Sequence, residues 1–149
     1  MSVLHVARNA LEDFWERYDL PVHWEKDAVY EVTTDFGFLV HIFVEEESGL
    51  IRVWTTLSPK ASDTQRKAVH AALLEVNLVD HLVFGGSLAL HPETLEIIYQ
   101  RTYDPLQGGW GGFSRFFIAF TEAASGLQAA VTTSIPGKED LPILSGMRA

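Results

Sequence analysis

The sequence contains no cysteine among its 149 residues. Without thiols, the chain cannot form a disulfide-stapled scaffold, a cysteine nucleophile, a CxxC redox pair or a cysteine-ligated zinc site. Basic residues are also few, since 11 Lys and Arg stand against 20 Asp and Glu and give a formal net charge of −9. This acidic excess disfavours nucleic acid and anionic membranes as partners, because both are bound mainly through clustered Lys and Arg.

Long apolar runs are missing as well. No run approaches the ~20 residues that a membrane-spanning helix needs. Residues 1–8 lack the basic start and apolar core of a signal peptide. We therefore expect no membrane insertion and a cytoplasmic location. The length and the hydrophobic content of 47% are typical of one folded domain.

Hydrophobic periodicity predicts a helix at the start of the chain, over residues 3–18. Its apolar residues recur at helical spacing, which gives one wide stripe. These residues are Leu4, Ala7, Leu11, Phe14, Trp15 and Tyr18. Pro21 follows closely, and proline disfavours helical geometry in the residue before it. The helix should therefore end near Tyr18.

Three strands are predicted next, over residues 28–34, 38–45 and 50–57. These stretches are rich in β-branched and aromatic residues and are separated by turn residues. The connections are short, whereas a parallel return would need a crossover of a dozen or more residues. We therefore expect antiparallel hairpins.

The second half of the chain contains a helix, two strands and a final helix. Ser62 and Gln65 form a capping-box pattern ahead of a helix whose apolar face is predicted from five residues. These are Val69, Ala72, Leu73, Val76 and Val79. Strands are expected over residues 87–91 and 95–103, and a helix from Phe113 or Ser114 onward, in which Gly126 is either interior or an early cap. Residues 1–134 are expected to form a single domain, and residues 135–149 a mobile C-terminal tail.

The predicted order is α-β-β-β-α-β-β-α. It indicates an α+β fold in which a twisted antiparallel sheet is flanked by helices, and it differs from the alternating βαβ pattern of nucleotide-binding parallel sheets. Some strands are apolar on both faces. Leu39 and Phe43, for example, alternate with the apolar Val40 and Ile42. Such a sheet needs a second covering layer, either from the chain's own helices or from another chain.

The sequence contains no recognisable catalytic or metal-binding motif. The six histidines lie in different predicted elements, without an HExxH pattern, and no GxSxG elbow is present. The acidic run over residues 45–47 is typical of a solvated hairpin tip. The glycine-rich run over residues 107–112 lacks the ending of a phosphate-binding loop. We therefore predict no enzyme, no cofactor and no metal, with a small enzyme whose groups converge only in three dimensions as an alternative.

Two stretches resemble the central signature of a known family. Residues 73–78 (LLEVNL) and 85–101 (GGSLALHPETLEIIYQR) are similar to the class I type III secretion chaperones, the Tir-chaperone family. In that signature a helix ends in Leu-Leu-x-x-Asn, and a glycine introduces two strands joined by a short turn. The resemblance covers residues 3–132. The sequence departs from the family in its longer connection over residues 79–84, its glycine-rich connector and its tail after Pro136.

The resemblance implies a homodimeric bacterial cytoplasmic chaperone with a role in virulence, which uses neither ATP nor a cofactor. Its partners would be the extended N-terminal segment of one or more effectors, and the secretion apparatus. Dimer-interface candidates carried over from the family are Val69, Leu73, Val76, Leu88 and Leu90. Effector-binding candidates are Trp15, Trp24, Leu39, Phe43 and Trp54. For each residue a place in the core of one chain is an equally good interpretation, and a YbjN-like regulator without a secretion role is an alternative function.

Overall fold

A computed structural model of the chain describes residues 2–57, 61–79, 83–108 and 111–134. The predicted tail over residues 135–149 lies outside the described residues. The elements are α1 (Val3–Arg17), β1 (Val29–Thr33), β2 (Leu39–Val44), β3 (Ile51–Leu57), the 3₁₀ turn η1 (Asp63–Gln65), α2 (Arg66–Asn77), β4 (Ser87–Leu90), β5 (Ile97–Tyr103) and α3 (Gly112–Ser134). The predicted α+β order is confirmed.

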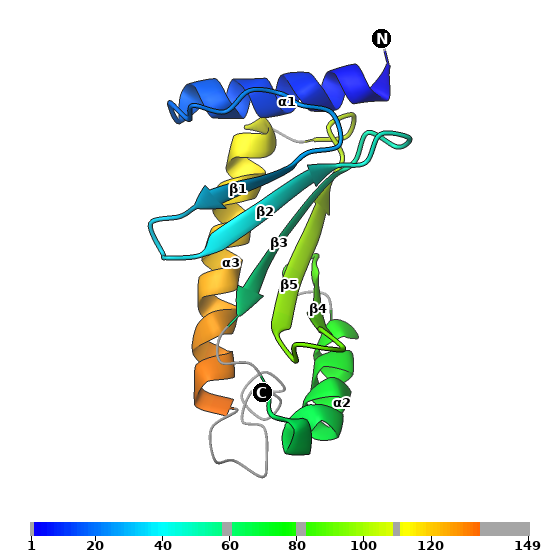
Figure 1. The fold of residues 1–149 in the computed structure, drawn as a ribbon, viewed down its shortest axis with the longest axis vertical. Helices are drawn as coiled ribbons and strands as arrows, with labels where there is room; N and C mark the ends of the chain where they lie inside the picture. Colours follow the sequence, from blue (N-terminus) through cyan, green and yellow to red (C-terminus); the bar gives the residue numbers. More distant parts are fainter. Residues whose placement is uncertain (1, 58–60, 80–82, 109–110, 135–149) are drawn as a thin grey trace.

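The strands form one five-stranded sheet in the order β1-β2-β3-β5-β4, and every neighbouring pair is antiparallel. The predicted hairpins are therefore confirmed. In Figure 1, α3 runs along the back of the sheet, α1 crosses one end, and α2 lies beside β4 at the other end. The fold thus covers one face of the sheet with α1 and α3.

The core lies between that face and the two helices. Alternate strand residues are buried, because successive side chains of a strand point to opposite faces. The buried strand residues include Tyr30, Val40, Ile42, Val44, Ile51, Val53, Leu57, Ile97 and Tyr99. From the helices come Ala7, Leu11, Phe14, Trp15, Phe113, Phe117, Phe120 and Leu127.

Aromatic contacts fix α1 over the start of α3. The ring of Phe14 meets the ring of Phe113 edge-on, with centroids 5.2 Å apart, and the ring of Phe117 at 4.8 Å. Tilted and edge-on pairs of this kind add about 0.5–1.5 kcal/mol each beyond their buried area. Gly126 lies inside α3, so it is an interior residue and not a cap.

The capping box ahead of α2 is present: the backbone N–H of Ser62 donates to Oε1 of Gln65 at 3.1 Å. The far end of this helix is earlier than the periodicity predicts. The helix ends at Asn77, and Val79, expected on its apolar face, is 37% exposed. At this end the N–H groups of Leu78 and Val79 bond to the carbonyls of Glu75 and Val76, three residues back, so the last turn tightens and the α-helix ends.

Asn77 closes the outer edge of β4. Its Nδ2 donates to the carbonyl of Leu88 at 2.7 Å, and its Oδ1 accepts from the N–H of Leu88 at 2.7 Å. The amide group therefore imitates a neighbouring strand at one residue of β4. This accounts for an asparagine at the end of the Leu-Leu-x-x-Asn pattern.

Replacing Asn77 by alanine should lower the free energy of unfolding by about 1–3 kcal/mol. Both backbone groups of Leu88 would lose their partner at a part-buried edge. Urea denaturation followed by circular dichroism measures the change. The matched variant Asn77→Asp keeps the acceptor but sets a second oxygen against the Leu88 carbonyl, so it should be destabilised by a similar amount. Two variants as stable as the parent chain would contradict this role.

Candidate partner-binding surface

The face of the sheet turned away from α1 and α3 is defined by the strand register and is called the open face. Residues of the open face pair with one another across the strands: Val29 with Phe43, for example, and His41 with Trp54. Its residues are Val29, Glu31, Thr33, Leu39, His41, Phe43, Arg52, Trp54, Thr56, Ser87, Ala89, Ile98, Gln100 and Thr102. In Figure 1 the strands lie in front of α3, so this face is turned to the viewer.

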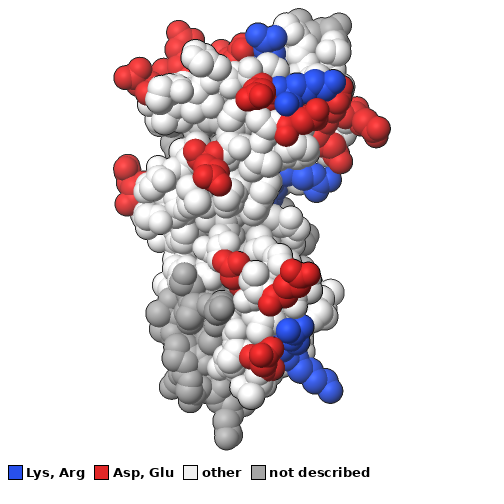
Figure 2. Space-filling model, viewed as in Figure 1, with Lys and Arg blue, Asp and Glu red and all other residues white. Residues whose placement is uncertain are grey.

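The open face combines apolar side chains with few charges. Val29 is 52% exposed and Leu39 is 44% exposed, while Phe43 and Trp54 are half-buried. In the same view, most charged side chains gather at the upper end, single acidic side chains lie further down, and uncharged surface separates them (Figure 2). Within the described part of the chain, no helix covers this apolar surface.

A row of side chains crosses three strands at the centre of the open face. The His41 imidazole stacks on the Trp54 ring with centroids 5.3 Å apart and planes inclined by 17°. On the other side, its Nδ1 lies 3.6 Å from Oε1 of Glu31, which is beyond hydrogen-bonding distance. The Trp54 ring is therefore held flat against a neighbour, as a rigid platform for contact.

The five predicted effector-binding residues fall on two sides of the sheet. Leu39, Phe43 and Trp54 share the open face. Trp15 lies in the core with 3% of its surface exposed, and its buried Nε1 has no hydrogen-bond partner among the described residues. Trp24 is partly buried and packs on the core side, 6.4 Å from the Tyr30 ring. An effector-binding role stays a prediction for all five, and only the first three are brought together on accessible surface.

The predicted dimer-interface residues lie where α2 packs beside β4. Four of the five are at most 4% exposed in the single chain, and Leu90 is half-buried. The four are Val69, Leu73, Val76 and Leu88. A place in the core, the second interpretation given above, accounts for their burial; the interface role stays a prediction.

The opposite side of α2 carries two leucines that the sequence reasoning did not select. Leu74 is 57% exposed and Leu78, just past the helix end, is 84% exposed. A spacing of four residues places them one turn apart on the same side. Their signal in the sequence is the pair of leucines at the same spacing within LLEVNL. These two side chains are the accessible apolar surface of this element.

Charged residues around the β2–β3 hairpin form hydrogen bonds and ion pairs with neighbouring side chains. In the acidic run after β2, the Ser48 hydroxyl donates to Glu45 at 2.6 Å, and Arg52 lies 3.4 Å from the same carboxylate. The hydrogen bond, and then the Arg52 charge, hold the pKa of Glu45 below its usual value. Glu46 pairs with Lys26 at 2.7 Å. The acidic run is therefore engaged in local contacts at the tip of the β2–β3 hairpin, which agrees with the predicted solvated tip.

Buried hydroxyls are also engaged. The Tyr99 hydroxyl donates to the carbonyl of Val83 at 2.9 Å, and burial raises the pKa of Tyr99 to about 12. Among the described residues, no group of three or more histidines or acidic residues is placed to hold a metal ion. None of the described helices is long and apolar enough to cross a membrane.

A hollow of about 700 Å³ lies between α1 and the start of α3. Its lining includes Asp13, Arg17, Tyr103 and Arg115 but no histidine. The hollow therefore gathers a carboxylate, two guanidinium groups and a phenol where the two helices meet. That the chain is not an enzyme stays a prediction.

These features define a class of protein: a small α+β domain with one covered and one open sheet face. The same fold occurs in three solved complexes. A chain of the ExsC–ExsE complex matches with a TM-score of 0.69 at 13% identity, over 87% of this chain and 96% of that one. A chain of the HopA1–SchA chaperone–effector complex matches with a TM-score of 0.66 at 16% identity, over 85% of this chain and 96% of that one.

The third is the ExoT–SpcS complex from Pseudomonas aeruginosa, with a TM-score of 0.60 at 17% identity, over 85% of this chain and 98% of that one. At such identities the likeness establishes the fold. No protein-family model matches the sequence, and no curated protein matches it.

Proposed function

We propose that the chain is a type III secretion chaperone that binds an extended segment of a secreted effector. The observation that supports this most is a fold shared, over nearly its whole described length, with a chain of a chaperone–effector complex. The resemblance of residues 73–78 and 85–101 to the Tir-chaperone signature points the same way. The role is binding without catalysis, in the cytoplasm of a bacterium.

The open face is the proposed docking surface. An extended chain presents alternate side chains to one side, and these can lie against apolar positions spaced along a sheet. Leu39, Phe43 and Trp54 offer such positions on adjacent strands. Among the described strands, β1 pairs with β2 alone, so its other edge can accept backbone hydrogen bonds from the same partner.

A second copy of the chain is the proposed partner for the outer side of α2. Leu74 and Leu78 are exposed in the single chain, and a two-fold interface would bury both side chains of each copy. The net charge of −9 limits association through other surfaces and favours effector segments that carry basic residues.

Co-expression tests the proposal. The tagged chain is produced together with each product of its neighbouring genes, purified, and treated with a protease. We expect one product to be retained, with its N-terminal segment protected and the rest of it cleaved, because only the bound segment is shielded. If the chain emerges alone from every co-expression, or if the protected segment is a folded domain, the proposal is wrong.

A further inference from the structure

A hollow of about 490 Å³ lies at one end of the open face. Its lining joins residues of the β1–β2 hairpin, the central strands and the residue before β5 with Gln128 of α3. Leu39, His41 and Thr56 belong both to this lining and to the open face, and Phe36 and Glu96 line the hollow as well. Phe36 is 57% exposed and Leu39 is 44% exposed, so apolar surface at the rim is open to solvent. The hollow is thus continuous with the proposed docking surface.

Glu96 is held rigidly at this place. Its carbonyl accepts from the N–H of His91 at 2.8 Å, and its N–H lies 3.4 Å from Oγ1 of Thr94. The next residue, Ile97, is 1% exposed and points into the core. Because side chains alternate along a strand, the Glu96 side chain is directed to the open-face side of the sheet.

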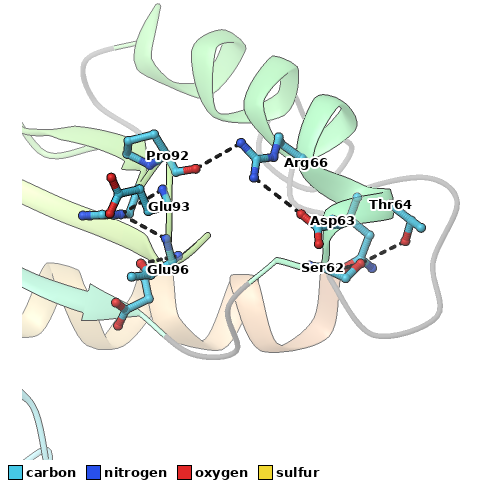
Figure 3. A network of polar contacts seen from close by, with 10 residues as sticks. Ser62, Asp63, Thr64, Arg66, Pro92, Glu93 and Glu96 are labelled. Carbon is cyan, nitrogen blue, oxygen red and sulfur yellow. Dashed lines mark hydrogen bonds and ion pairs between the residues drawn. The ribbon is translucent and has the colours of Figure 1, made fainter.

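The carboxylate of Glu96 has no ion pair and no hydrogen bond within the described part of the chain. The nearby cation, Arg66, is already engaged: its guanidinium donates to the carbonyl of Pro92 at 3.0 Å and lies 3.4 Å from Asp63. Figure 3 shows these contacts, with the Glu96 carboxylate pointing away from them. A half-buried acid thus faces the hollow without a counter-charge.

We propose that this hollow is a subsite for a basic side chain, lysine or arginine, of the bound partner segment. The apolar stem of such a side chain packs on Phe36 and Leu39, and its cation meets Glu96. An apolar side chain in the same place would strip water from the carboxylate without replacing it, which is unfavourable. The subsite rests on the proposed function, because an extended partner must lie on the open face to reach it.

Two short fluorescein-labelled peptides test the subsite. Both have leucine at alternate positions and threonine between them, and they differ only in one central residue, lysine or N-acetyl-lysine. Fluorescence anisotropy measures the Kd of each. The parent chain should bind the lysine peptide about fivefold more tightly at low salt, and the preference should shrink as salt screens the pair. Glu96→Gln should abolish the preference, because the lysine cation then meets no counter-charge in the hollow.

Glu93→Gln is the matched control. Glu93 lies in the same β4–β5 turn but does not line the hollow, so this variant should keep the preference for lysine. Equal binding of both peptides by the parent chain, or an undiminished preference in Glu96→Gln, would overturn the subsite while leaving docking on the open face intact. Binding of neither peptide would overturn that docking, and the subsite with it.

Discussion

Replacing Leu78 by glutamate is expected to turn the proposed dimer into a folded monomer. The Leu78 side chain is 84% exposed, so in the single chain the new carboxylate stays in water and the fold is undisturbed. In the proposed dimer the same charge would be buried without a partner, at a cost of several kcal/mol. Because a two-fold interface contains the substituted residue of both copies, the dimer Kd should rise at least ~100-fold. Light scattering gives the mass, and circular dichroism gives the fold.

The buried side of α2, opposite Leu78, supplies the contrasting variant, Leu73→Glu. Leu73 is 4% exposed, so the charge would enter the core and the chain should lose more than ~4 kcal/mol and fail to fold. A folded monomer from Leu73→Glu would instead place this residue in the interface, as the resemblance implies. If Leu78→Glu stayed a folded dimer, the contact between copies would not run through the outer side of α2.

Apolar residues lie on both sides of α2, and the sequence alone could not predict which side contacts the rest of the chain and which contacts another copy. Periodicity places Val69, Leu73 and Val76 on one side of the helix, but it does not say whether a strand of the same chain or a second chain covers them. The structure places β4 there, and leaves Leu74 and Leu78 exposed. The identity of the covering layer is a tertiary property that no local pattern contains.

The order of the elements and their hairpin pairings were predictable, because alternation and helical spacing are strong signals and short loops permit only antiparallel neighbours. The pairing of β3 with β5 was not, because α2 and β4 lie between these strands in the sequence. Nor was the start of β5. Residues 95–103 read as one strand, yet the strand begins at Ile97 because Leu95 adopts a φ of 61° and its N–H bonds back to the carbonyl of His91. Leucine rarely takes this left-handed conformation, so composition gives no hint of it.

The tryptophans also show that local spacing predicts which face of an element a residue lies on, but not whether that face is covered. Alternation along β3 turns Trp54 away from the buried Val53 and Thr55, and the structure places it together with Leu39 and Phe43 on the open face. Trp15 shares its helical stripe with the core residues Ala7 and Leu11, and it is buried with them. A tryptophan is thus a good candidate for contact only where its own element leaves it accessible.

Trp54→Ala should therefore abolish effector retention while the chain stays folded. Trp54 is half-buried and lies on the open face, so its loss removes the stack with His41 but leaves the core intact, at a cost of about 1 kcal/mol in stability. In the complex, a tryptophan at the centre of an interface contributes about 2–4 kcal/mol, which corresponds to a Kd raised ~30- to 1,000-fold. Co-purification with the effector, followed by calorimetry of the pair, measures both effects.

Trp24→Ala is the control, because it removes a tryptophan from the other side of the sheet. Trp24 packs beside Tyr30 against the core, so its loss should lower the melting temperature more than Trp54→Ala does. Below that temperature the variant should retain the effector as the parent chain does. The reverse pattern, with binding lost in Trp24→Ala and kept in Trp54→Ala, would move the docking surface from the open face to the side of the sheet on which Trp24 packs. The two variants together decide which face of the sheet holds the partner, since each tests one face and leaves the other unchanged.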